Sequence, residues 1–143
     1  MTDLRAVAQR YADEVWNAKN LEAADELFTA DHVYHDPLIP DLPPGPEGVK
    51  QRRGAFMMAM SDAVVTVNRW IMEGDLAAAM WTYSGTNDGE MMGMPATGKR
   101  AEIEGVHVFR FEGERIAESW VFGDTLGLLQ QLGLVQLGVP AAS

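Results

Sequence analysis

The sequence has no cysteine among its 143 residues. Disulfide bonds, thiolate nucleophiles and zinc sites built from thiolates are therefore excluded. Basic residues are also scarce, with 11 Lys and Arg against 21 Asp and Glu, which gives a formal net charge of -10 at pH 7. This excess of negative charge argues against nucleic acid or an anionic membrane surface as a partner, because their phosphates would repel the chain.

The sequence also gives no indication of a targeting segment, and common nucleotide motifs are missing from it. The start MTDLRAVAQRY is polar and helical, so we expect no signal peptide, and no apolar run is long enough to span a bilayer. These absences predict a cytoplasmic protein. No P-loop, dinucleotide fingerprint or G-x-S-x-G elbow occurs in the sequence.

The composition that remains is that of an ordinary globular protein. Hydrophobic residues make up 47% and charged residues 22%, and the length suits one domain over residues 1–143 with a substantial core. The chain also has 9 Met and 4 Trp. Methionine adapts to irregular space and tryptophan supplies large flat surfaces, so these residues suit either a core or a ligand pocket.

The first half of the chain reads as helices. Apolar residues at i, i+3 and i+4 spacing predict a helix over residues 3–19, and Asn20 begins a short second helix that includes Leu27 and Phe28. DHVYHDP follows as an extended segment. A third helix is expected from Pro46 to about Met60, with its KQRR stretch on a solvated face.

The second half reads as strands. AVVTVNRWIM, LAAAMWTYSGT and two further segments, 100–111 and 114–123, are rich in β-branched and aromatic residues, and TLGLLQQLG closes the chain as a short helix. Helices followed by an antiparallel meander predict an α+β fold, in which helices pack on one face of a curved sheet.

One ionisable side chain falls on the apolar face of a predicted strand. Side chains alternate along a strand, and His107 shares its face with Ile103, Phe109 and Phe111. A buried imidazole needs a hydrogen-bond partner, because leaving it unpaired costs about 1–3 kcal/mol. A lone inward histidine is more often a satisfied core residue than a catalyst, and both interpretations remain open here.

The final hairpin offers a partner. A two-residue turn at Glu112-Gly113 places His107 opposite Glu118, where two titratable groups in an apolar concavity could act as acid and base. A three-residue turn would flip the face of the returning strand. The inward residues would then be Ala117, Ser119 and Val121.

A second polar cluster is YHDP. Pro37 keeps Asp36 out of helical geometry, so Asp36 could either form a turn at the end of the strand or point into a pocket. A metal site built from His32, His35, Asp36 and His107 is disfavoured, because no Glu-x-x-His or His-x-x-x-His spacing appears.

These residues resemble the SnoaL-like polyketide cyclases, within the nuclear-transport-factor-2-like superfamily, over most of the chain. The matching pieces are Gly93-Met94-Pro95 with Thr97, Val106-His107, the hairpin Arg110–Ile116 and Gln131-Leu132-Gly133. The N-terminal AVAQRYADEVWNAKNLEAADELF, followed by YHDP, is similar to the whole superfamily, steroid isomerases included.

The resemblance implies a cone-shaped α+β fold. A curved antiparallel or mixed sheet packs against three N-terminal helices around a deep apolar pocket, and two or more copies associate through the sheet, most simply as a homodimer. It also implies ring closure by an intramolecular aldol step without cofactor or metal. An aspartate abstracts an activated carbon-bound proton, and pocket groups stabilise the enolate.

The resemblance also assigns roles to residues. His107 matches the pocket histidine of the family, whereas the aspartate position in Ser119-Trp120-Val121 holds Val121, which leaves Asp124 and Glu118 as substitutes. In a steroid-isomerase-like template, Tyr11 would bind the oxyanion and Asp36 would be the base. The candidate catalytic residues are His107, Asp36, Glu118 and Asp124.

A pocket for an apolar small molecule needs large, mostly aromatic walls. The residues expected to bind the substrate are Tyr11, Trp16, His35, Trp81, Tyr83, Phe109, Trp120 and Phe122. The resemblance therefore implies a lyase or isomerase acting next to a carbonyl group. The alternative is a non-catalytic protein that binds a small molecule in the same pocket.

Overall fold

The computed structural model describes residues 3–136 and is built on a five-stranded sheet. The strands lie in the order β1 (Phe28–His35), β5 (Arg115–Gly123), β4 (Arg100–Glu112), β3 (Leu76–Thr86) and β2 (Val64–Glu73). β1 runs parallel to β5, and every other neighbouring pair is antiparallel. The sheet is therefore mixed, with its one parallel strand at the edge.

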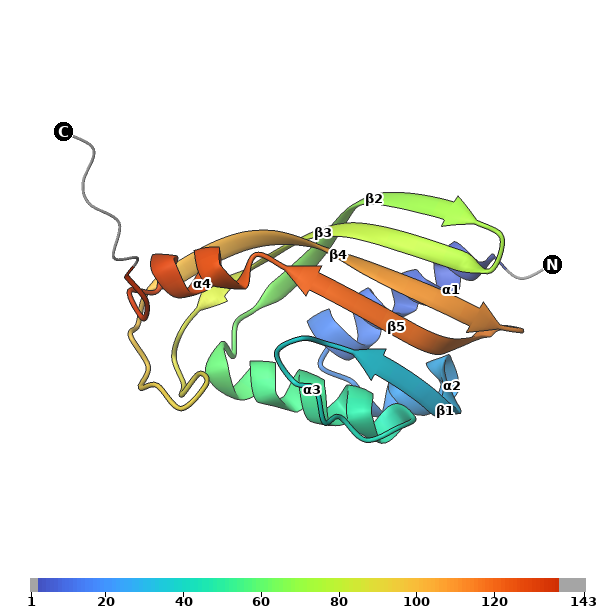
Figure 1. Ribbon diagram of the computed structural model, residues 1–143, viewed down its shortest axis with the longest axis horizontal. Coiled ribbons are helices and arrows are strands. Elements are labelled where there is room, and N and C mark those ends of the chain that lie inside the picture. Colours follow the sequence, from blue (N-terminus) through green and yellow to red (C-terminus); the bar gives the residue numbers. More distant parts are fainter. Residues whose placement is uncertain (1–2, 137–143) are drawn as a thin grey trace.

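Most of the helical segments precede the meander. They are α1 (Leu4–Arg10), η1 (Tyr11–Asn17), η2 (Leu21–Ala23), α2 (Ala24–Leu27), α3 (Pro46–Ala59) and α4 (Thr125–Gln131). Figure 1 shows α1 crossing the sheet, α3 running beside β1, and α4 at the opposite end of the molecule from the β2–β3 turn. The expected α+β architecture, with helices packed on a curved sheet, is confirmed. Within residues 3–136, no helix is long and apolar enough to cross a membrane.

The first helix differs from its expected form. After α1 the chain continues as a π-helix, η1, in which the amide of Ala18 donates to the carbonyl of Asp13, five residues earlier. In an α-helix Tyr11 and Trp16 would lie about 140° apart around the axis. Hydrogen bonding to the fifth preceding residue brings such positions back toward one face. Both side chains are buried as a result.

The helix that contains KQRR is also different from expectation. Arg52 and Arg53 are only 5% and 1% exposed, so the predicted solvated face is wrong for both. The guanidinium of Arg53 lies over the ring of Trp16 and donates to the Trp16 carbonyl, while Arg52 pairs with Asp36. These partners come from distant segments, and they offset part of the cost of burying the two charges.

The register of the final hairpin corrects the expected pairing of His107. Glu112 pairs with Arg115, so the turn is one residue later than expected, and an irregularity between Arg110 and Phe111 adds a further shift. The later turn moves the pairing by two positions and keeps the face of β5, whereas the irregularity moves it by one more and flips that face. His107 therefore lies opposite Val121, and the expected pairing of His107 with Glu118 is wrong.

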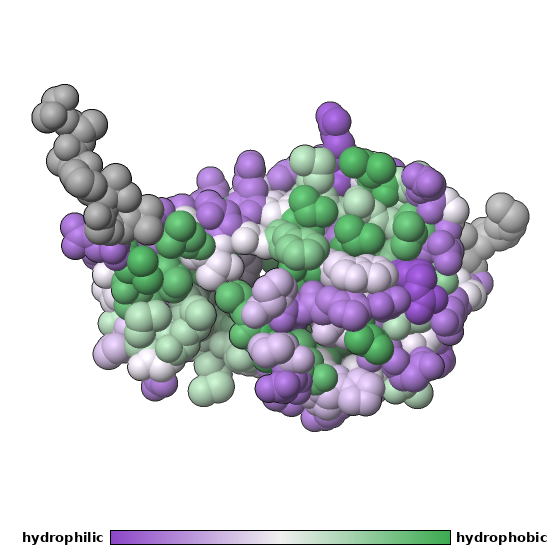
Figure 2. Space-filling model, in the orientation of Figure 1, coloured by the Kyte–Doolittle hydropathy of each residue, from purple (hydrophilic) through white to green (hydrophobic). Residues whose placement is uncertain are grey.

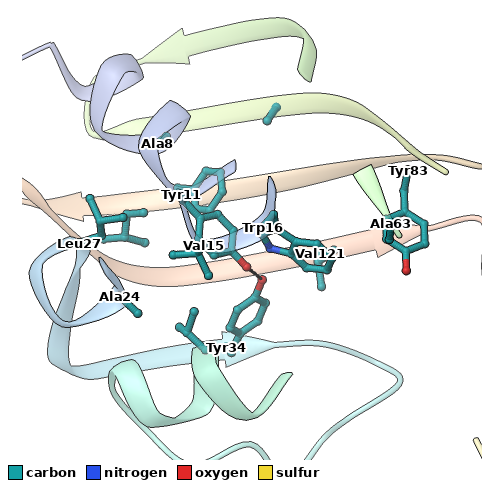
Figure 3. Packing of buried hydrophobic residues seen from close by; sticks show 14 of the residues in the cluster. Ala8, Tyr11, Val15, Trp16, Ala24, Leu27, Tyr34, Ala63, Tyr83 and Val121 are labelled. Atoms are coloured by element: carbon teal, nitrogen blue, oxygen red, sulfur yellow. Dashed lines mark hydrogen bonds between the residues drawn. The ribbon is translucent and has the colours of Figure 1, made fainter. Parts of the chain in front are cut away.

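The inner face of the sheet is built from rows of paired residues. Ala79, His107 and Val121 form one row across β3, β4 and β5, and all three are buried. Figure 3 shows how Tyr11, Val15 and Trp16 project from the first helix toward this face. The hydrophobic core thus lies between the helices and the inner face, at the level of His107.

Candidate active site

A cavity of about 330 Å³ opens between the inner face of the sheet and the helices. Its walls are mainly apolar and come from η1, α3, α4, the segment after β1 and all of the strands β2–β5. Figure 2 shows a hollow between α4 and the strands, bordered largely by apolar side chains. The size suits a small organic molecule, since ligand pockets typically begin at about 300 Å³.

Most of the sequence-predicted site residues line this cavity. They are Tyr11, Trp16, Asp36, Trp81, Tyr83, His107, Phe109 and Phe122. They come from the first helix, from the residue after β1 and from three strands, so the fold gathers distant parts of the chain around one space.

The other four predicted residues are not among those that line it. Glu118 lies on the outer face, where its carboxylate contacts His35 Nε2 at 2.6 Å and Arg110 Nε at 3.1 Å. Trp120 stacks on the ring of His35 on that same face, with the ring centroids 5.3 Å apart. Asp124 caps α4 by accepting a hydrogen bond from the amide of Gly127.

His107 is held by a buried chain of hydroxyl groups. Its Nε2 lies 2.6 Å from Tyr34 Oη, which lies 2.9 Å from Tyr11 Oη. Figure 3 shows the two tyrosines pointing toward each other from the first helix and β1. The imidazole also stacks on Phe109, with the ring centroids 4.7 Å apart. The buried histidine is thus paired, and its orientation is fixed.

The surroundings of His107 keep it neutral. Burial, with smaller contributions from Arg52 and His32, holds the pKa of His107 well below its ordinary value of 6.5. Burial also raises the pKa of Tyr34 well above 10.0. A neutral imidazole has one donor and one acceptor nitrogen. If Nε2 donates to Tyr34, Nδ1 is a potential base, and if Nε2 accepts, Nδ1 is a donor.

A buried ion pair forms the second polar element of the cavity. Arg52 Nε lies 2.6 Å from Asp36 Oδ2, and Asp36 Oδ1 accepts from the amide of Leu38 at 2.9 Å. Both oxygens of Asp36 are therefore engaged. Burial alone would lower the pKa of Arg52, but the oxygens of Tyr34, Tyr11 and Asp36 raise it above its ordinary value. Arg52 is thus a permanent cation at the cavity wall.

Sequence reasoning missed two residues of this site, Tyr34 and Arg52. Tyr34 could have been found, because alternation along β1 puts His32, Tyr34 and Asp36 on one side, and all three are buried. Arg52 gave no local signal, because its neighbours Lys50 and Gln51 are polar like the rest of an exposed helix face. Its partner Asp36 is 16 positions away.

The structure does not gather the histidines and acids into a metal-binding group. Among residues 3–136, no three His, Cys, Asp or Glu side chains converge in a way that could hold an ion. His32 instead pairs with Ser119 Oγ at 2.8 Å, and burial lowers the pKa of His32 to about 4.

The model of the SnoaL-like polyketide cyclase family matches residues 6–132. The chain belongs to this family. A SnoaL-like fold accounts for the helices that precede the meander and for the cavity between these helices and the sheet. A comparison with curated proteins finds no match.

Solved structures agree with this assignment. TsrD from Streptomyces laurentii is 27% identical, with a TM-score of 0.82 over 94% of this chain and 100% of its own. IdmH from Streptomyces antibioticus, a proposed polyketide cyclase, is 29% identical, with a TM-score of 0.80 over 92% and 99%. AclR from Streptomyces galilaeus, a proposed hydroxylase, is 25% identical, with a TM-score of 0.79 over 93% and 97%.

Within this SnoaL-like site, one position has unexpected chemistry. The family resemblance expects the catalytic aspartate at position 121, where this chain has Val121. Val121 is buried, lines the cavity and pairs with His107 across the sheet. The sheet wall beside His107 is therefore apolar at this position. Asp36 is the one carboxylate among the described residues that line the cavity.

Proposed function

We propose that this SnoaL-like protein is an enzyme that removes a proton next to a carbonyl group of an apolar small molecule and closes a ring by an intramolecular aldol step. One observation carries the proposal: the neutral, oriented imidazole of His107 and the buried cation of Arg52 line the same apolar cavity. A base and a positive charge in an apolar cavity are the two groups that enolate formation needs.

His107 is the base in this proposal. Asp36 is a poorer candidate, because Arg52 and the amide of Leu38 already engage its two oxygens. Tyr34 orients the ring when Nε2 donates to its hydroxyl group, and Nδ1 then carries the free lone pair. A histidine with a lowered pKa is neutral at pH 7 but is a weak base. The substrate should therefore carry an acidified C–H bond, such as one between two carbonyl groups.

The proposed reaction conserves protons. Nδ1 of His107 takes the proton, and the electron pair of the C–H bond moves toward the carbonyl oxygen to give an enolate that Arg52 stabilises. The enolate carbon then attacks a second carbonyl carbon of the same molecule and forms the new C–C bond. The resulting alkoxide takes the proton back from the imidazolium. Return of the proton to another carbon instead would make the reaction an isomerisation.

Deuterium exchange tests this function without knowledge of the natural substrate. An apolar 2-alkyl β-keto ester, whose acidified C–H bond exchanges only slowly in buffer, is incubated in deuterated buffer with the protein, and loss of its acidic C–H signal is followed by proton NMR. His107→Gln should lower the enzymatic exchange rate by at least about a hundredfold, the usual contribution of a general base. His35→Gln, on the outer face, is the matched control and should leave the rate unchanged.

A specific observation favours the second candidate function, a binding protein without catalysis. Val121 replaces the expected acid, and Asp36 is committed to an ion pair, so the cavity offers no free carboxylate among the described residues. Binding of the β-keto ester by calorimetry with no exchange above the buffer rate would support this candidate and overturn the enzyme proposal.

We also propose that two copies associate through the outer face of the sheet. Met80, Val106 and Phe122 form one row across β3, β4 and β5, on the opposite face from the row that contains His107. Met80 and Phe122 are 43% and 60% exposed, and Phe122 also borders the cavity. Figure 2 shows apolar side chains gathered over these strands. Exposed apolar patches of this kind commonly mark protein interfaces. Met80→Glu should shift the mass measured by light scattering from dimer to monomer, whereas an unchanged mass would contradict this interface.

A further inference from the structure

Two N–H groups at the cavity are buried without a partner. Arg52 Nη1 and Trp81 Nε1 make no hydrogen bond within residues 3–136, and both residues line the cavity. Native proteins leave few buried donors unsatisfied, because each costs about 1–3 kcal/mol. Two such donors at one cavity suggest that the bound ligand supplies the missing acceptors.

The position of Trp81 depends on two glycines. Trp81, Gly105 and Gly123 form one row across β3, β4 and β5. A Cβ atom on Gly105 would lie 2.3 Å from Cζ2 of the indole, and one on Gly123 would lie 3.1 Å from its Cη2. The ring therefore occupies the space that side chains on the neighbouring strands would fill. Because neither glycine has a side chain, the indole can lie against the neighbouring strands.

A second tryptophan at the cavity, Trp70, differs from Trp81 in having a partner for its N–H group. Trp70 also lines the cavity, but its Nε1 already donates to Oε1 of Gln9 at 3.0 Å. The two indoles have the same chemistry and share the cavity, and they differ in whether the protein itself satisfies the N–H group. Trp70 is thus a matched control for Trp81.

Arg52 lies in surroundings with a positive balance. Helix α3 contributes two buried guanidinium groups, those of Arg52 and Arg53, and the residue after β1 contributes one carboxylate, that of Asp36. The chain as a whole has a net charge of -10. Asp36 engages Nε of Arg52 and leaves Nη1 unpaired. An oxygen that gains negative charge is therefore favoured at Arg52, whereas the neutral N–H group of Trp81 suits a carbonyl oxygen.

We propose that Arg52 and Trp81 bind two separate oxygens of one ligand, so that the cavity selects apolar diketones over monoketones. This inference rests on the proposed function. It assigns the oxygen of the developing enolate to Arg52 and the oxygen of the second carbonyl to Trp81. An intramolecular aldol step needs both carbonyls, whereas an isomerisation needs one. The presence of two donors therefore favours ring closure over isomerisation as the reaction.

Matched ketones test the assignment. The monoketone and the diketone of decalin, and the same pair built on androstane, are compared by calorimetric titration at equal concentrations. In the natural protein, the diketone of the pair that fits should bind about tenfold more tightly, the contribution expected from satisfying one buried donor. Trp81→Phe keeps the apolar ring and removes the N–H group, so it should reduce the preference to about twofold or less.

The controls separate the two donors. Trp70→Phe should keep the tenfold preference, because the Trp70 N–H group is already satisfied within the protein. Arg52→Lys keeps a charge beside Asp36 and removes the planar fork. It should weaken both ketones of a pair by a similar factor, because they share the first oxygen.

Three outcomes would overturn the inference: equal affinity of the two ketones in the natural protein, a preference that survives Trp81→Phe, or no binding of either pair. If only the proposed reaction is wrong, the binding experiments and the exchange experiment give different answers. If the diketone is preferred and the preference needs Trp81, but no deuterium exchange occurs, the two-oxygen site stands and the proton abstraction does not.

Discussion

The two faces of the sheet hold histidines at the same distance from a partner but in opposite settings. His107, on the inner face, lies 2.6 Å from the neutral hydroxyl of Tyr34 in a buried network. His35, on the outer side, lies 2.6 Å from the carboxylate of Glu118, and 45% of its side chain is exposed. Water can replace the outer contact at little cost, whereas it cannot reach the inner one. Equal hydrogen-bond lengths therefore conceal unequal energies.

The two faces of the sheet should differ most in how much stability is lost when an ion pair on each face is broken. Arg52→Met leaves the buried carboxylate of Asp36 without its partner and should lower the free energy of unfolding by about 3–5 kcal/mol. Arg110→Met, which breaks the outer contact with Glu118, should cost less than about 1 kcal/mol. Urea unfolding followed by circular dichroism measures both losses.

A double variant sharpens this test. Asp36→Leu combined with Arg52→Met replaces the pair by apolar side chains and should recover much of the stability that Arg52→Met loses. Similar losses for Arg52→Met and Arg110→Met would show that the two faces do not differ in this way.

The effect of replacing a glycine by alanine on stability should depend on the atoms that the new methyl group meets. Gly105→Ala adds a methyl group that meets the indole of Trp81, so it should lower the free energy of unfolding by about 1–3 kcal/mol and weaken ligand binding. Gly54→Ala, in α3, meets nothing within 4 Å. It should stabilise the protein by about 0.5–1 kcal/mol, because alanine favours a helix. A stabilised Gly105→Ala variant would mean that Trp81 can move freely.

The buried histidines should make the protein sensitive to mild acid. The pKa of His32 falls from 6.5 to about 4 in the folded state because of burial, and the pKa of His107 is lowered for the same first reason. The unfolded chain then binds more protons than the folded one between about pH 6.5 and 4. Stability therefore falls as the pH falls through this window, by up to about 1.4 kcal/mol per pH unit for each histidine.

Replacing one histidine checks the sign of this effect. His32→Gln should reduce the slope of unfolding free energy against pH in this window, as measured by urea titrations at several pH values. An unchanged slope in His32→Gln would show that this histidine does not contribute to acid sensitivity.

The smallest effect should come from the outer carboxylate. The hydrogen bond from His35, and then that from Arg110, lowers the pKa of Glu118 below 4.5, so its contribution to stability is present above that pH and is lost as the pH falls. Because Glu118 is partly exposed, Glu118→Gln should change the free energy of unfolding at pH 7 by less than about 1 kcal/mol. A loss of several kcal/mol would place Glu118 in a structural role that its exposure does not suggest.

The parts of the site that follow local rules were predictable from the sequence. Alternation along a strand placed His107 inward, and Pro37 marked Asp36 as the end of an extended segment. The same alternation contained Tyr34, although its role needed the observed distance to His107. Local periodicity therefore identifies which residues face the interior, but not which of them meet.

The parts that depend on a shift or on distant partners were not predictable. A bulge between Arg110 and Phe111 turns Glu118 outward, and no residue type in the hairpin indicates that bulge. Arg52 is buried because Asp36 and several aromatic rings surround it. Its own helix segment looks like an exposed one, so its burial appears only in the folded chain.

The π-helix in residues Tyr11–Asn17 has a consequence for how the cavity could change over generations. The segment has wider turns than an α-helix, so removal of one residue could restore α-helical hydrogen bonding without breaking the helix. Such a deletion would rotate either Tyr11 or Trp16 away from the cavity. A single lost codon would thus reshape the cavity in one step, while the sheet and its register stay as they are.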